Sequence, residues 1–178
     1  GYSYVLSPVG ASPCDLVTTC SITANTLCTL PGQYTLSGEV TFANPPATGT
    51  MTVVNSCGGS QVFNAPFTSP IAYSIPGLTA NGSSCTVSAS FSDSTDCSAS
   101  LPYTAPLTPA APTASVTVQP TCTTPTGTIV VTAPTGATIQ YSVGGAYQSS
   151  GTFTGLTPGS YNVTAQNTAT GCISAATV

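Results

Sequence analysis

The 178-residue sequence contains no lysine, arginine, histidine or tryptophan, and its only acidic residues are Asp15, Glu39, Asp93 and Asp96. General acid–base catalysis needs a side chain that titrates near the working pH, and histidine is the usual choice. Without histidine, no Ser-His-Asp triad and no histidine-based metal site can form. We therefore predict that the protein is not an enzyme and has no catalytic, cofactor-binding or metal-binding residues.

The absence of basic residues also excludes two classes of partner. Nucleic-acid binding depends on Lys and Arg, which neutralise backbone phosphates and release counterions. Attraction to anionic lipid needs a polybasic segment, and no apolar run reaches the roughly 20 residues of a membrane-spanning helix. We expect no nucleic-acid binding and no direct membrane insertion. The chain starts at Gly1 without a positively charged leader, so we expect a processed chain or a segment of a longer one.

The residues that are abundant predict an all-β protein. The chain has 17 glycines and 16 prolines among many Thr, Ser and Val residues, and it shows no helical periodicity. Thr, Val, Ile and Tyr favour a pleated, half-buried surface, and Pro and Gly fall between the strand-like runs. The length is better suited to two small sandwich domains than to one core.

A proline-rich seam divides the chain. The stretch 102–112 holds four prolines, which remove ladder donors and favour an extended linker. We predict an N-terminal extended strand at 1–10, a first domain at 11–107 and a second at 108–178. The strand-like runs are 21–24, 33–42, 49–55, 61–63, 71–75, 84–92 and 98–103 before the seam, and 115–119, 127–133, 137–143, 151–154, 159–166 and 173–178 after it.

Both halves share one order of motifs: an aromatic residue, Gly-Leu, a turn, an alternating strand and a cysteine. The matching segments are 73–78, 85–89 and Cys97 in the first half, and 152–156, 161–165 and Cys172 in the second. Internal repetition of this kind is typical of tandem arrays of domains.

At these motifs the chain resembles known surface proteins. The second half resembles the SprB-type repeat of gliding-motility adhesins, which are very large surface proteins of Bacteroidota exported by the type IX secretion system. The first half looks like the immunoglobulin-like repeats of similar proteins. The resemblance rests on segments 112–122, 125–129, 141–143, 153–156, 158–159, 161–164 and 171–172 for the second half, and on 35–42, 44–49 and 63–67 for the first. It implies two tandem immunoglobulin-like antiparallel β-sandwich domains, a bacterial cell-surface location and no reaction.

The eight cysteines are interpreted as disulfides of an extracellular protein. No Cys-x2-Cys pair is present and no histidine accompanies the cysteines, so a zinc site is disfavoured. In the second domain only Cys122 and Cys172 are available, and we expect them to pair. This bond would close a loop of about 50 residues and contribute about 4 kcal/mol in the chain-entropy model.

Six cysteines of the first domain allow several pairings. If 49–56 and 85–92 are antiparallel neighbours, Cys57 and Cys85 lie at the same end and can bond. By analogy with the second domain, Cys97 should reach back to Cys20 or Cys28, and Cys14 should pair with the other. The sequence does not choose between these two alternatives.

The few remaining polar motifs offer modification sites. Asp93 and Asp96 could form the rim of a calcium site, but a solvated turn between two strands explains them more simply. The resemblance to Bacteroidota proteins implies that Asp93-Ser94-Thr95 is an O-glycosylation acceptor, with Ser94 or Thr95 modified. Asn81 and Asn162 begin N-glycosylation sequons. Glu39 alternates within a strand and is expected to face solvent.

The first residues suggest a contact between chains. Tyr2, Tyr4 and Leu6 alternate on one face of a strand-like segment that precedes the first domain element. An open sheet edge is where another chain adds a strand, so residues 1 to 8 either complete a neighbouring subunit or cover the edge of their own domain.

We expect an extracellular structural subunit or repeat segment of a bacterial cell-surface filament or adhesin. Its partners would be other copies of the same protein or neighbouring repeats. The alternative is a discrete adhesin module that binds surface carbohydrate through sandwich loops. The absence of Trp, the commonest sugar-stacking residue, favours the first. Thr-rich strands also suggest an ice-binding protein. That function needs a long, flat array of repeated Thr-x-Thr motifs, and here pairs such as Thr126 and Thr128 are isolated.

Overall fold

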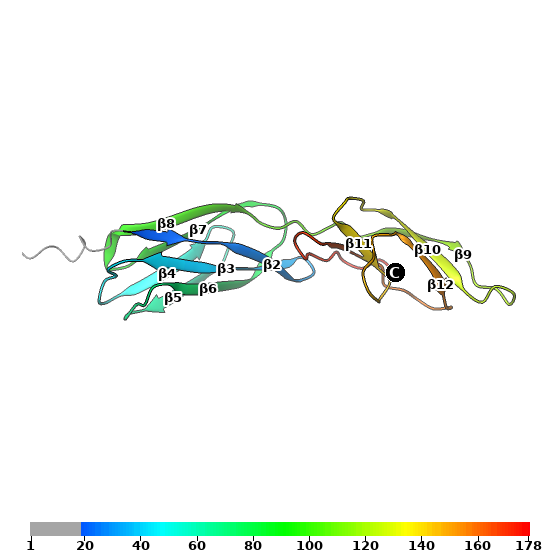
Figure 1. The fold of residues 1–178 in the computed structure, drawn as a ribbon, viewed down its shortest axis with the longest axis horizontal. Coiled ribbons are helices and arrows are strands. Elements are labelled where there is room, and N and C mark those ends of the chain that lie inside the picture. Colours follow the sequence, from blue (N-terminus) through cyan, green and yellow to red (C-terminus); the bar gives the residue numbers. More distant parts are fainter. Residues whose placement is uncertain (1–18) are drawn as a thin grey trace, which may run out of the picture. The chain divides into compact units, whose positions relative to one another are not determined.

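A computed structural model describes residues 19–178, together with their side chains except those of Thr95 and Asp96, and within this range the chain forms strands and no helices. The all-β prediction is confirmed (Figure 1). The strands are β1 (Cys20–Ile22), β2 (Asn25–Leu30), β3 (Gln33–Phe42), β4 (Thr50–Asn55), β5 (Ser60–Asn64), β6 (Ile71–Thr79), β7 (Ser84–Phe91), β8 (Ser94–Thr104), β9 (Thr113–Val118), β10 (Gly127–Ala133), β11 (Ile139–Ser142), β12 (Thr152–Leu156) and β13 (Thr164–Asn167).

Strands β1 to β8 form two sheets. In one sheet β3 pairs with β1, β2 and β6, and the other has the order β5-β4-β7-β8. The register of β4 is antiparallel to both neighbours, with Val53 opposite Gln61 on β5 and Ala89 on β7. Because side chains alternate across a strand, each strand offers one face to the core and one to solvent.

The core of these sheets follows from that alternation. Val40, Met51, Val53, Val87 and Ala89 are buried at every second position of their strands. Three aromatic rings extend the core in edge-to-face contacts with centroids 5.0 to 6.4 Å apart, an arrangement that aromatic quadrupoles favour. These rings belong to Phe42, Phe67 and Phe91.

Strands β9 to β13 form a second pair of sheets. One has the order β12-β10-β9, and the other pairs β11 with β13. Isolated bridges join Val163 to Thr177 and Gln166 to Ile173, which brings the last residues alongside β13. The core cluster consists of Val131, Tyr141, Phe153, Val163 and Ala165.

The chain divides into two compact units. Among the described residues, the first holds 19–25, 37–75 and 85–103, and the second holds 26–36, 76–84 and 104–178. The domain boundary near residue 108 stays a prediction. The repeated motif order has a structural counterpart, because Gly77 on β6 and Gly155 on β12 both have positive φ, 74° and 71°, a conformation that favours glycine.

Candidate functional site

Strand β9 presents an open, apolar sheet edge. Among the described residues it pairs only with β10, and it forms one end of the sheet β12-β10-β9. Its alternate residues Ala114, Val116 and Val118 share the face that lines two surface hollows. Val116 is 51% exposed and Val118 is 43% exposed, although a residue on the inner face of a sandwich is normally covered by the opposite sheet.

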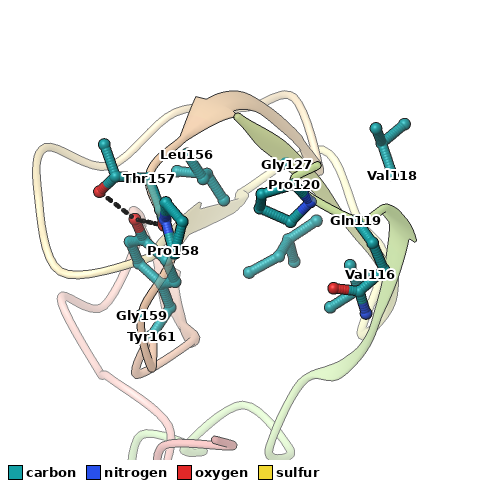
Figure 2. A pocket seen from close by; sticks show the side chains of 11 residues that line it. Val116, Val118, Gln119, Pro120, Gly127, Leu156, Thr157, Pro158, Gly159 and Tyr161 are labelled. Atoms are coloured by element: carbon teal, nitrogen blue, oxygen red, sulfur yellow. Dashed lines mark hydrogen bonds between the residues drawn. The ribbon is translucent and has the colours of Figure 1, made fainter. Parts of the chain in front are cut away.

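Two adjoining hollows make a groove along β9, which we call the β9 groove. They have volumes of about 300 and 250 Å³, and both are lined by Val116, Ile129, Gly159 and Tyr161. In Figure 2, Val116 and Gln119 stand on one side, and Pro158 and Tyr161 stand on the other. Register explains the β10 contribution, since Ile129 lies opposite Val116.

The groove exists because the opposite sheet, β11 with β13, is too short to cover the inner face of β9. Strands β11 and β13 have four residues each, and the chain crosses from β12 toward β13 through Thr157 to Tyr161. The Tyr161 hydroxyl donates a hydrogen bond to the Thr157 carbonyl at 2.8 Å. A tyrosine bonded to backbone a few residues upstream at this corner is typical of immunoglobulin-like sandwiches. Beside this corner, Val116 and Val118 of β9 remain exposed.

The chemistry of the β9 groove suits burial of apolar side chains. Among the described residues no charged side chain lines either hollow, so filling the groove desolvates no ionised side chain of the described part. The larger hollow lies at the lower limit of the roughly 300–1,000 Å³ that small-molecule sites occupy. An extended chain could pair with the free edge of β9 and place alternate side chains in the hollows, as in strand addition.

Two disulfides lie in the described chain, and one differs from expectation. Cys57 pairs with Cys85, which is the pair expected from antiparallel β4 and β7. Cys172 pairs with Cys28 instead of Cys122, so the expected Cys122–Cys172 bond is corrected. Both residues of the Cys28–Cys172 bond belong to the second unit.

The position of Cys122 explains the correction. Cys122 lies in the loop between β9 and β10, before the first residue of β10. Cys172 lies beyond the other end, because its carbonyl accepts from the Asn167 amide at 2.9 Å and Asn167 pairs with Ile139 at the start of β11. The seven residues of β10 separate the two ends by about 20 Å, whereas bonded cysteines have Cα atoms within about 7 Å.

Neither of the two open alternatives forms: both require Cys28 to bond to Cys97 or Cys14, and Cys28 is bonded to Cys172, so they are corrected. Cys20 and Cys97 are free thiols, and the Cys97 thiol contacts that of Cys20. Burial, followed by this contact, raises the pKa of Cys97 to about 12, so the thiol is neutral at physiological pH. Cys122 is an exposed free thiol. Cys14 lies outside the described residues.

The Asp93 turn uses its carboxylate locally. Thr48 Oγ1 and Ser92 Oγ each donate to one Asp93 carboxylate oxygen at 2.7 Å. These bonds hold the pKa of Asp93 below its usual 3.8. A Cβ on Gly49 would collide with this carboxylate, which explains the glycine. Among the described residues no group of three or more acidic, Cys or His side chains gathers at a metal-binding distance.

Glu39 is exposed, and its backbone pairs with Thr23: the Glu39 amide donates to Thr23 Oγ1 at 2.9 Å.

The structure places the candidate glycosylation sites differently. Ser94 is 2% exposed and its hydroxyl is buried with no hydrogen-bond partner in the described part of the chain. The expected O-glycosylation of Ser94 is therefore corrected, because the folded domain does not present this oxygen. The Thr95 side chain is outside the description. Asn81 and Asn162 are exposed, and their glycosylation stays a prediction.

The N-terminal strand residues Tyr2, Tyr4 and Leu6 lie outside the described residues. Sequence reasoning missed the β9 groove, because alternation in Ser115–Gln119 predicts a strand but not whether its inner face is covered. No signal in the sequence points to it, because the predicted runs 137–143 and 159–166 are longer than the four-residue strands β11 and β13 that form.

The fold defines a protein of tandem immunoglobulin-like β-sandwiches stapled by disulfides. No family model matches the chain, and no curated protein matches it. Among solved structures, the chain is similar to a segment of two fibronectin type-III domains from chicken tenascin. The two are 18% identical with a TM-score of 0.30, and the match covers 92% of this chain and 97% of that chain.

Proposed function

We propose that this protein is an extracellular, non-enzymatic structural subunit or repeat segment of a bacterial cell-surface filament or adhesin of the SprB-like type. It associates with copies of itself through strand edges or domain ends. The observation that carries the proposal is the open edge of β9, where Val116 and Val118 remain exposed. Soluble sandwiches usually protect such edges with lysine or other charged side chains, and this chain has no lysine at all.

The disulfides support the extracellular part of the proposal. Disulfides persist in oxidising compartments, and the described chain contains Cys28–Cys172 and Cys57–Cys85. Within residues 19–178 no helix has the length and apolar character needed to span a bilayer.

The test is electron microscopy of native, unheated protein near neutral pH, combined with sedimentation velocity over a hundredfold range of concentration. The proposal expects filaments or concentration-dependent oligomers. A chain that stays monomeric at every concentration and shows only dispersed particles would overturn self-assembly.

The carbohydrate-binding alternative has one structural observation in its favour. A hollow in the first unit includes Thr23, Asn25, Ser37, Glu39 and Tyr73 in its lining. The Tyr73 hydroxyl donates a hydrogen bond to the Thr23 carbonyl. A glycan array compared with Glu39→Gln tests this site: a signal that the substitution removes would support it, and no binding would reject it.

A further inference from the structure

The β9 groove has the form of a strand acceptor. In the described part of the chain no strand pairs with the edge of β9 that faces away from β10. Three inward positions, Ala114, Val116 and Val118, follow each other at every second residue of β9. Opposite them stand Gly159 and Tyr161, which line both hollows. The backbone of a strand added beside β9 would therefore pair with β9 and extend the sheet. Its inward-facing side chains would fill the groove.

One segment of this chain has the complementary pattern. Tyr2, Tyr4 and Leu6 place three large apolar or aromatic side chains at every second residue, which matches the three inward positions of β9. The segment from residue 2 to residue 6 has no charged side chain, so it can enter a groove whose described lining has no charged side chain without desolvating an ionised side chain. The segment has five residues, so it is close in length to β9, which has six.

The length of the chain before β1 allows this segment to reach another molecule. Description of the structure begins at residue 19, and the twelve residues from 7 to 18 span up to about 40 Å when extended. A contact from the N-terminal segment of one copy to the second unit of another is head-to-tail. Contacts of this type generate open filaments when the rotation does not close a ring.

We propose that residues 2 to 6 of a second copy add as a strand beside β9 and place Tyr2, Tyr4 and Leu6 in the β9 groove. This inference rests on the proposed self-assembly and names the contact that produces it. The added strand covers Val116 and Val118 and completes the inner face of the sheet β12-β10-β9.

The first experiment measures strand addition separately from assembly. A chain lacking residues 1 to 8 is mixed with a synthetic peptide of the sequence GYSYVLSP, and hydrogen exchange is followed after peptic digestion. The expected result is one peptide bound per chain, with slowed exchange in residues 113–118. The control peptide carries Ser in place of Tyr2, Tyr4 and Leu6 and should give no protection. Absence of protection by the natural peptide would overturn the proposal.

Substitutions at two exposed edge valines provide a matched pair. Val116→Lys places a charge in the groove and should weaken peptide binding about tenfold or more. Val62 is 55% exposed on the edge strand β5, outside the groove, so Val62→Lys should leave peptide binding unchanged. Circular dichroism melting checks that both variants fold. Equal effects of the two substitutions would contradict a specific site at β9.

The second experiment asks whether the strand comes from another copy. The full chain, the chain lacking residues 1 to 8 and the Val116→Lys variant are compared by sedimentation velocity. Loss of association in both variants is expected. Association that survives the deletion would overturn this inference and leave the proposed function standing. A monomeric full chain whose β9 is protected until residues 1 to 8 are deleted would show that the segment folds back onto its own chain, which also overturns it.

Discussion

At the scale of single residues, Asp93 shows how a chain with few charges uses one. Its carboxylate accepts from Thr48 and Ser92 and fills the space left by Gly49. Hydrogen bonds to the charged form lower a carboxyl pKa, and the group is fully exposed to solvent. Because the folded-state pKa lies below the unfolded one, the stabilisation is present above the unfolded value and is lost as the pH falls through the folded value.

Thr48→Val removes one of these donors. The expected result is a rise of the Asp93 pKa toward 3.8, measured by carboxyl ¹³C NMR titration. Thr52→Val on β4 is the control, because Thr52 lies opposite Ser90, two residues before Ser92. An unchanged Asp93 pKa in Thr48→Val would show that this hydroxyl does not stabilise the carboxylate.

The cysteines differ in reactivity for physical reasons. Thiolate is the reactive form, and burial beside Cys20 keeps Cys97 protonated, whereas Cys122 is exposed. Alkylation of the native, unreduced chain with iodoacetamide, followed by chymotryptic and peptic mass mapping, should label Cys122 and spare Cys97. Linked peptides should join Cys28 to Cys172 and Cys57 to Cys85. A linked Cys122–Cys172 peptide would contradict the structure.

At the scale of elements, the corner between β12 and β13 positions the β9 groove. Tyr161→Phe removes the hydroxyl bond to the Thr157 carbonyl and retains the ring that lines the groove. A typical intramolecular hydrogen bond contributes about 1 kcal/mol, so the free energy of unfolding should fall by about that amount in urea titration. Tyr161→Leu, which also removes the ring, should cost more. No change in the urea midpoint for Tyr161→Phe would show that the corner does not depend on this bond.

The sequence predicts strand bounds correctly where a strand-like run adjoins glycine or proline turns. The runs 33–42 and 127–133 become β3 and β10 with the same bounds, because the first alternates, the second is rich in β-branched residues, and glycine or proline turns adjoin both. Sequence reasoning missed β2, whose residues are mostly exposed, since an edge strand with little burial has a weak apolar period. The sequence also could not predict the partner of Cys172. That pairing depends on the fold, which places Cys122 and Cys172 near opposite ends of β10.

At the scale of the whole molecule, the scarcity of charge sets how copies can associate. The sequence has no lysine or arginine and four acidic residues, so salt bridges between side chains of opposite charge cannot hold an assembly. Association through apolar burial and backbone pairing should change little between about 20 and 500 mM NaCl, because screening acts on charges. Sulfate should strengthen it. Sedimentation equilibrium checks both, and a steep loss of association in NaCl would contradict the account.

The central claim is that copies of this chain assemble through the edge of β9, and electron cryomicroscopy of the native material tests it most directly. The account predicts filaments with a regular axial repeat and a strand of density beside Thr113–Val118 that covers Val116. Dispersed particles at every concentration, or filaments in which β9 remains an open edge, would contradict it.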